Sequence, residues 1–536
     1  MTSTLSHLLL QAADAHPDRP AVWSSTGELT YADLCDRSTR LARALVEHGI
    51  EPGDRVVIAL AKDVALPVAI FGTLLAGGAY VPIDYLTPPA RAHTIAADAE
   101  PVAVVSSPRT MEAMLFGDAE PAREGAGDNS PALHWLGRGW FDPDRSPERR
   151  PVSESLSRLR QLGRLRSPVE ASALAYILYT SGSTGRPKGV AHTHASALAF
   201  VRWAVDAVGV SENDVVSQHA SPSFDLSVFD FFGAAMAAAR LALVPSSTFG
   251  RVASLCRFIV ASGVTVWYSV PSALLRASAT ESLALLQHGA LRQIIFAGEE
   301  IPVGPLGVLW HNLPRSCRVA NWYGPTETNV CTFHDVTALD VNGGDPIPIG
   351  RPCPYARTSL AAEDGLVMSN GAAGELLVAG DSLMTGYWKR PDATSRVFST
   401  GPDGRVYYAT GDLVSQDARG FTFRGRVDRL LKVRGHRVQP EEVEQVLEQR
   451  AEIDEAAVVK HRRGDVDVLA AVVRLGGGGG LEHDAVIGHC CRFLPPYMVP
   501  DVILPVGELP RGPRGKTDYH AVLELVESGL RKGRRG

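Results

Sequence analysis

The sequence predicts a layered α/β fold, and three features point to it. A predicted strand over 56–60 is followed by a predicted helix over 65–76, so strand and helix alternate early in the chain. Apolar, β-branched runs at 175–179, 265–270 and 292–297 are typical of buried strands. With 536 residues and 45% hydrophobic content, the chain can form a large core and two to four domains.

The remaining elements are assigned from periodicity and from turn residues. Apolar positions at helical spacing predict helices over 6–16 and 31–49, and Thr30 is the expected N-cap of the second. The segment 80–84 is expected to be an extended turn, because its proline cannot continue a helix. Residues 105–170 are rich in Ser, Pro, Arg and Gly and predict loops.

Charge and cysteine content limit the possible partners. The net charge of −6 and the pI near 6.3 favour neither nucleic acid nor an anionic membrane. The seven cysteines form no CxxC pair, so neither a zinc site nor a disulfide framework is indicated. We find no cleavable leader at the N-terminus and no apolar run of roughly 18 residues, and we expect a cytoplasmic protein.

A glycine- and hydroxyl-rich loop follows the strand at 175–179 and predicts a phosphate site. Its residues are Thr180, Ser181, Gly182, Ser183, Thr184, Gly185 and Lys188. The glycines let backbone N–H groups turn toward an anion, and the lysine adds positive charge. The loop is not a Walker motif, because Arg186 and Pro187 separate the last glycine from the lysine. A helix over 195–208 is expected to point its N-terminal dipole at the anion, which favours ATP. In isolation, a surface turn is the alternative.

Two further stretches combine aromatic and acidic residues. Asp225 lies among aromatic residues at 223–232, where it is either a helix N-cap or a counter-ion for a ligand's ammonium group. The stretch 321–328 contains Tyr323, whose ring can stack on a base, and Glu327, whose carboxylate can hold Mg²⁺ against phosphate oxygens. Alone, this second stretch could also be a capped turn.

Several motifs, taken together, resemble those of the acyl-adenylate-forming superfamily. They are the loop 180–189 and the segments 321–328, 408–413, 425–428 and 514–516. Further segments resemble the adenylation domains of nonribosomal peptide synthetases; these are 29–34, 78–84, 224–225, 374–375 and 494–500. The resemblance runs from about residue 6 to about residue 525. It implies a large N-terminal domain of layered sheets and helices and a small, mobile α+β C-terminal domain.

The resemblance also implies a reaction and a nucleotide site. Such enzymes activate a carboxylic acid with ATP, release pyrophosphate and pass the acyl group to a phosphopantetheine thiol. The implied catalytic residues are Lys516, Lys188 and Thr326, and Glu327 is the implied Mg²⁺ ligand. The implied nucleotide-binding residues are Thr180, Ser181, Gly182, Ser183, Thr184, Gly185, Gly298, Glu299, Asn321, Tyr323, Asp412 and Arg426.

The implied domains are 1–427 and 428–536, with a hinge at Asp428. By resemblance, the small domain turns about this hinge. Lys516 then serves adenylate formation, and the segment 432–437 meets the thiol in the second step.

The residues of the substrate pocket are also assigned by resemblance. Its implied residues are Asp225, Leu226, Phe229, Ser269, Ile295, Ala297, Trp322, Val330, Cys331 and Lys516. An aspartate at the position of Asp225 marks α-amino-acid activators within the family. Because the other groups are mostly apolar and neutral, we expect a small or medium neutral amino acid. Proline is the first candidate, and alanine, threonine or a nonproteinogenic relative are the others.

We therefore expect a free-standing amino-acid adenylating ligase of nonribosomal peptide or related natural-product biosynthesis. No carrier motif follows Lys516, so the thiol is expected on a separate phosphopantetheinylated carrier protein. A small MbtH-like helper protein is a further expected partner. Two alternatives stay open, namely an acyl-CoA or aryl-acid ligase and a catalytically silent binding module of the same fold.

Overall fold

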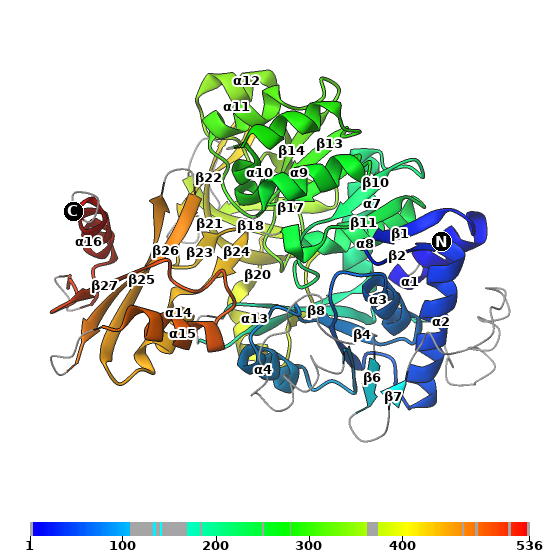
Figure 1. The fold of residues 1–536 in the computed structure, drawn as a ribbon, viewed down its shortest axis with the longest axis horizontal. Helices are drawn as coiled ribbons and strands as arrows, with labels where there is room; N and C mark the ends of the chain where they lie inside the picture. The colour runs from blue at the N-terminus through cyan, green and yellow to red at the C-terminus, as the bar shows by residue number, and fades with distance from the viewer. Residues whose placement is uncertain are drawn as a thin grey trace.

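The computed structural model shows a large N-terminal domain and a smaller C-terminal domain, both mixed α/β, as the sequence predicts (Figure 1). It describes residues 4–107, 132–135, 140–141, 169–182, 185–248, 251–278, 280–361, 373–463, 466–476, 481–512 and 516–532. Within these ranges, no helix has the length and apolar character needed to cross a membrane.

An eight-stranded sheet carries the predicted phosphate loop. Its order is β19-β9-β8-β4-β3-β5-β6-β7. The bounds are β3 Arg55–Ala59, β4 Ala79–Pro82, β5 Ala103–Ser106, β6 Ala132–Trp135, β7 Trp140–Phe141, β8 Leu174–Thr180, β9 Lys188–Thr193 and β19 Gly386–Tyr387. The predicted strands at 56–60 and 175–179 are confirmed as β3 and β8.

Two expectations for this sheet are wrong. The segment 80–84 is not only a turn, because β4 pairs in parallel with β3 and β8, and Pro82 is tolerated at the strand's end. The expected loops at 105–170 include β6 and β7, which extend the sheet beyond β5. The rest of that region, apart from residues 105–107 and 169–170, lies outside the described residues.

A nine-stranded sheet lies above the first in the view of Figure 1, in the order β16-β15-β14-β13-β12-β10-β11-β1-β2. The bounds are β1 Pro20–Ser24, β2 Gly27–Thr30, β10 Val215–Gln218, β11 Arg240–Leu243, β12 Val266–Ser269, β13 Gln293–Phe296, β14 Arg318–Tyr323, β15 Thr332–Asp335 and β16 Arg351–Pro352. The predicted strands at 265–270 and 292–297 are confirmed as β12 and β13. Both run parallel to β14, so all three end at one edge of the sheet.

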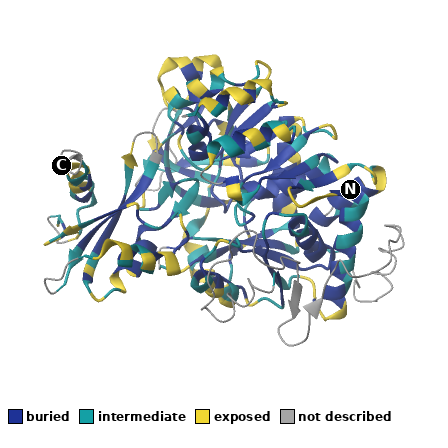
Figure 2. Cartoon of the chain, in the orientation of Figure 1, coloured by how far each residue is buried: buried dark blue, intermediate teal, exposed yellow. Residues whose placement is uncertain are grey.

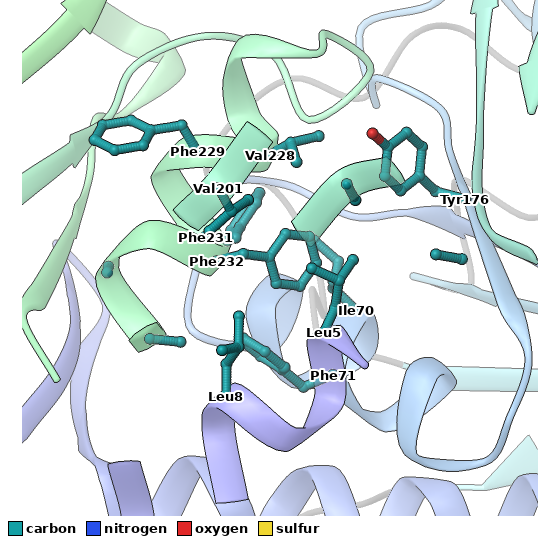
Figure 3. Packing of buried hydrophobic residues seen from close by; sticks show 14 of the residues in the cluster. Leu5, Leu8, Ile70, Phe71, Tyr176, Val201, Val228, Phe229, Phe231 and Phe232 are labelled. Carbon is teal, nitrogen blue, oxygen red and sulfur yellow. The ribbon is translucent and has the colours of Figure 1, made fainter. Parts of the chain in front are cut away.

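Helices pack with these sheets to form the main core (Figure 3). The helices of this layer are α1 Leu5–Ala15, α2 Tyr31–Glu47, α3 Ala65–Leu75, α7 His194–Val208 and α8 Leu226–Met236. Helix α2 begins with a capping box in which Thr30 and Asp33 satisfy each other's backbone N–H groups, as the predicted N-cap implies. The Phe71 ring of α3 meets the Phe232 ring of α8 edge to face, with centroids 5.5 Å apart.

The other helices of the N-terminal domain lie around the sheets, and the strands are mostly buried (Figure 2). They are α4 Pro89–Ala99, α9 Val252–Ala261, α10 Pro271–Ser278, α11 Val303–His311, α12 Ala338–Gly343 and α13 Pro391–Val397, with the 3₁₀ turns η2 Ser246–Thr248 and η3 Glu281–His288.

A third, five-stranded sheet leads toward the C-terminal domain. Its strands are β17 Ala356–Ala361, β18 Ala373–Gly380, β20 Phe398–Thr400, β21 Val406–Asp417 and β22 Gly420–Arg426. Strands β21 and β22 pair antiparallel, and their register places Asp412 opposite Arg426.

The C-terminal domain has its own hydrophobic clusters and appears orange to red in Figure 1. Its strands are β23 Leu431–Val433, β24 His436–Val438, β25 Ile453–Arg463, β26 Val466–Leu475 and β27 Val502–Val506, and its helices are α14 Pro440–Glu448, α15 His483–Phe493 and α16 Tyr519–Lys532. Strands β23 and β24 form a hairpin with a two-residue turn. The hairpin reaches from this domain into the N-terminal domain.

Candidate active site

A central cavity of about 110 Å³ lies where β8, β14 and β21 meet the start of α8 and the β23–β24 hairpin. Among its lining residues are the predicted site residues Thr180, Ser181, Asp225, Leu226, Ala297, Gly298, Tyr323, Thr326, Val330, Asp412 and Arg426. The structure therefore brings together side chains that lie up to about 250 positions apart in the sequence.

The predicted phosphate loop lies at the rim of the central cavity. A Cβ atom on Gly182 would lie 2.2 Å from the carbonyl oxygen of Arg186, so only glycine fits there. The buried hydroxyl of Thr180 has no hydrogen-bond partner within the described part of the chain, whereas Ser181 donates to the Arg437 carbonyl at 2.7 Å. An unsatisfied hydroxyl on a cavity wall indicates a place for a polar ligand. Ser183 and Thr184 lie outside the described residues.

The expected helix after the loop is present as α7, but its predicted role is wrong. Strand β9 comes between the loop and the helix, and it pairs antiparallel with β8 from Lys188 back to Thr193. The N-terminus of α7 therefore lies beside the start of β8, at the far end of the hairpin from the loop. Its dipole cannot act on an anion there, because the effect fades within one helical turn.

Glu327 is a buried carboxylate with three polar partners. It is fully buried and lies 2.6 Å from Arg437 and 3.5 Å from Lys188, and the Tyr387 hydroxyl donates to it at 2.7 Å. Burial would raise the pKa of Glu327, but Arg437 and Lys188 outweigh it and hold the pKa below its usual value. Burial lowers the pKa of Lys188, and Glu327 opposes that shift.

These contacts bear on the predicted Mg²⁺ site. Across the described ranges, no cluster of three or more His, Cys, Asp or Glu side chains is placed to hold a metal ion. Both Glu327 oxygens already face cations or a hydroxyl, with Arg437 on one of them. A hard cation needs several free oxygen ligands, so Mg²⁺ does not fit at Glu327 while Arg437 is in place.

Asp412 contacts a second group of polar side chains, and two of them, Tyr323 and Arg426, are predicted nucleotide-binding residues. The Tyr323 hydroxyl donates to it at 2.5 Å, Arg426 forms an ion pair with it, and the ammonium group of Lys432 lies 3.1 Å away. Burial would raise the pKa of Asp412, but Lys432 and Arg426 lower it on balance, so the group is ionised at neutral pH. The Lys432 ammonium also lies 5.2 Å from the centre of the Tyr323 ring.

A second cavity of about 360 Å³ adjoins the central one and shares Gly298, Tyr323, Arg426 and Lys432 with it. The predicted residues Glu299, Asn321 and Trp322 line this second cavity, as does Asp428. Ser272 donates its backbone N–H to the Glu299 carboxylate, and Asn321 donates to the Pro348 carbonyl. The predicted nucleotide residues are therefore divided between two adjoining cavities.

Asp225 faces the apolar part of the central cavity. It stands at the N-cap position of α8, but its side chain makes no capping hydrogen bond, which counts against the alternative of a simple helix cap. Burial raises its pKa, although Thr326 and Arg437 oppose the shift. A carboxylate in such a place is stabilised by a cationic ligand.

Four of the other predicted pocket residues do not line the central cavity but lie behind its wall. Phe229, Ile295, Trp322 and Cys331 are buried, and the Trp322 ring packs on Phe229 with centroids 5.6 Å apart. They support the wall, which agrees with the expectation that Cys331 carries no chemistry.

The prediction for Ser269 is wrong. Along β12 side chains alternate between the two faces of the sheet, and the neighbouring Tyr268 faces the central cavity. The Ser269 hydroxyl instead contacts His219 Nδ1 at 2.8 Å on the opposite face. The prediction missed Tyr268 and Phe200, which complete the apolar wall with Leu226.

Lys516 lies apart from the central cavity. It is exposed in the C-terminal domain, where its carbonyl accepts the backbone N–H of Gly512. In its place the β23–β24 hairpin supplies Lys432 and Arg437. The prediction assigned this segment to the thiol step but did not assign individual contacts to Arg437 and His436. The signal was the dense run of basic residues around Gly435.

Comparisons with known proteins agree with this fold. Residues 9–388 match the AMP-binding enzyme family, and residues 442–516 match its C-terminal domain. An L-proline–[L-prolyl-carrier protein] ligase of Streptomyces coelicolor is 38% identical over 97% of this chain and 96% of its own. A ligase of the same name from Pseudomonas fluorescens is 33% identical over 98% of this chain and 99% of its own. The crystal structure of the Vibrio cholerae adenylation domain AlmE with glycyl-adenosine-5′-phosphate superposes with a TM-score of 0.82, at 25% identity and 98% coverage of both chains.

The fold and the site thus define an adenylate-forming ligase that uses ATP. The chain belongs to the AMP-binding enzyme family.

Proposed function

We propose that this enzyme activates L-proline as prolyl-AMP, releases pyrophosphate and passes the prolyl group to a carrier-protein thiol. The observation that carries the proposal is that the carboxylate of Asp225 faces the apolar part of the central cavity. Both curated relatives described above are named as proline–carrier protein ligases, which supports the choice of substrate.

The cavity suits proline on chemical grounds. The carboxylate of Asp225 can pair with the substrate's ammonium group, and a charge-assisted hydrogen bond of this kind is worth about 1.5–3 kcal/mol. Phe200, Leu226, Tyr268 and Val330 surround it with apolar groups. A charged substrate side chain would lose its hydration there without gaining a partner.

The nucleotide contacts are part of the same proposal. The loop from Thr180 to Lys188 would hold the β- and γ-phosphates, Asp412 the ribose hydroxyls, and Tyr323 the adenine ring. The substrate carboxylate would attack the α-phosphorus, and pyrophosphate would leave. Lys188 and Thr326 would stabilise the charge that develops on the phosphates. Mg²⁺ would bind at Glu327 only after Arg437 has withdrawn.

We assign the described arrangement to the second step, because the hairpin occupies the site and Lys516 is distant. For the first step, residues 428–536 would turn about Asp428 and bring Lys516 to the substrate carboxylate. Asp428 is suited to a pivot because its side chain is 45% exposed and its ion pair with Arg426 is local.

A route for the thiol supports the carrier-protein step. A third cavity of about 330 Å³ lies between the domains and shares Tyr179, Ser223, Phe224, His436 and Tyr497 with the central cavity. A phosphopantetheine arm that enters here would reach the adenylate through this shared wall. An MbtH-like helper protein is a further proposed partner.

The test is amino-acid-dependent exchange of labelled pyrophosphate into ATP with a panel of amino acids. We expect proline to give the strongest exchange. Exchange that is strongest with an aryl or fatty acid would favour the acyl-CoA or aryl-acid ligase. Absence of exchange with every acid, with and without an MbtH-like helper, would favour the silent module.

A further inference from the structure

Three arginines line the third cavity, and their partners differ. Arg91 forms a buried ion pair with Glu442, which links the two domains. Arg434 forms an ion pair with Asp501. The side chain of Arg276 forms no hydrogen bond and no ion pair within 4 Å in the described part of the chain. Of the three arginines, Arg276 therefore lacks a directly paired carboxylate.

The surroundings of Arg276 are unfavourable for a positive charge. The pKa of Arg276 is lowered by burial and then by the positive charge of Arg434, and the negative charge of Glu299 offsets this only in part. Arg276 lies in the last turn of α10, where a cation interacts favourably with the helix dipole. That effect explains a cation at the helix end, but it does not explain a second guanidinium close by on the same cavity wall.

Arg434 reaches this wall through the turn of the β23–β24 hairpin. Arg434 and Gly435 both have positive φ values, 54° and 81°, as a two-residue type I′ turn requires. Such a φ is strained for arginine, which indicates that its side chain is needed at this position. Arg276 belongs to the N-terminal domain and Arg434 to the C-terminal domain, so the pair forms only when the hairpin is docked.

Asp84 is the acidic residue on the same cavity wall, and within the described part of the chain it forms no ion pair with either arginine. Its two carboxylate oxygens accept hydrogen bonds from the Ser221 hydroxyl and from the Leu86 backbone N–H. A monoanionic phosphodiester would relieve the repulsion between the guanidinium groups, because arginine binds phosphate oxygens with a planar fork of donors.

We propose that Arg276 and Arg434 bind the phosphate of the carrier protein's phosphopantetheine arm at the third cavity. The inference rests on the proposed function, because it assumes a phosphopantetheine thiol. The bound phosphate stabilises the docked hairpin, so the correct thiol donor favours the arrangement that transfers the acyl group.

The test uses two small thiols, 4′-phosphopantetheine and pantetheine, which differ only in the phosphate. With the full-length enzyme, proline and ATP, we expect prolyl-thioester formation to be about tenfold more efficient with 4′-phosphopantetheine. Arg276→Gln should remove this preference and leave proline-dependent pyrophosphate exchange unchanged. Arg276→Lys should retain part of the preference.

Arg257→Gln is the matched control, since Arg257 is exposed on the neighbouring helix α9 and lines none of the three cavities. Binding of both thiols is also measured by calorimetry, so the phosphate site is tested even if no thioester forms. A wild-type enzyme that binds or uses both thiols equally well overturns the inference, as does an unchanged preference in Arg276→Gln. Failure of proline exchange contradicts the proposed function instead.

Discussion

At the scale of single residues, the site depends on which face of a strand a side chain occupies. Tyr268 and Ser269 are neighbours in β12, yet Tyr268 lines the central cavity and Ser269 contacts His219 on the other face. A shift of one residue in reading the strand exchanges these two roles.

Substitutions at this pair test the assignment. Ser269→Ala should change the KM for proline by less than about twofold, because Ser269 does not line the central cavity. Tyr268→Ala should raise that KM about tenfold, because it removes an apolar wall worth about 1–3 kcal/mol to a small substrate. Pyrophosphate exchange over a range of proline concentrations gives both values. A larger effect from Ser269→Ala would contradict the described register.

Residue types alone predicted part of the polar site. Asp225 and Glu327 stand out in the sequence, because a carboxylate is costly among aromatic residues and can hold a cation beside a phosphate. Asp412 was assigned only by the resemblance to the adenylate-forming superfamily. The partners of these carboxylates were harder to predict. Arg437 comes from a separate domain, and no local pattern shows that its guanidinium pairs with Glu327.

At the scale of elements, the β23–β24 hairpin connects the domains. Lys432 and Arg437 on its two strands contact Asp412 and Glu327 of the N-terminal domain. Gly435 at the turn lies close to Val270, which precedes α10, and a Cβ atom on Gly435 would lie 2.4 Å from a methyl carbon of Val270. This close fit allows the hairpin to dock.

Gly435→Ala should therefore impair docking. We expect transfer of the prolyl group to the carrier protein to fall by at least about tenfold, because the added methyl group clashes and the positive φ disfavours alanine. Pyrophosphate exchange should change little, since adenylate formation does not use this contact. Gly488→Ala in α15 is the control, because a Cβ atom there meets nothing within 4 Å. Equal loss in both half-reactions would argue against a separate docked state.

Most elements were predictable because their local signals agree with their environment. Helix α2 has an apolar face and a capping box, and β8 is an unbroken apolar run. The prediction that α7 points its N-terminus at the phosphate loop was wrong for a topological reason. The helix itself was predicted correctly, but the strand β9 between the loop and the helix was not. Without β9, the helix would have begun at the phosphate loop.

At the scale of the whole molecule, the two domains must adopt more than one arrangement under the proposed mechanism. The described arrangement has the hairpin in the site, and Lys516 is exposed in the C-terminal domain. The sequence alone could not show which arrangement is present, because both arrangements have the same local structure and differ only in how the domains pack.

Lys516→Ala tests this two-state account. We expect proline-dependent pyrophosphate exchange to fall by about 100-fold, because a positioned cation at the reacting oxygens is lost. Transfer from supplied prolyl-AMP to the carrier protein should fall by less than about threefold, since Lys516 is not at the site in that step. Arg474→Ala is a control in the same domain, because Arg474 lines none of the three cavities and has a surface ion pair to Asp454. Comparable losses in both steps would refute the assignment.

The central claim is that Asp225 holds the substrate's ammonium group, and one comparison tests it most directly. Pyrophosphate exchange is measured for wild type and Asp225→Asn with proline and with tetrahydrofuran-2-carboxylate, in which an ether oxygen replaces the ring nitrogen. We expect wild type to prefer proline by about 100-fold and Asp225→Asn to show almost no preference, because only the charged pair distinguishes the two acids. A preference for proline that survives in Asp225→Asn would contradict the account.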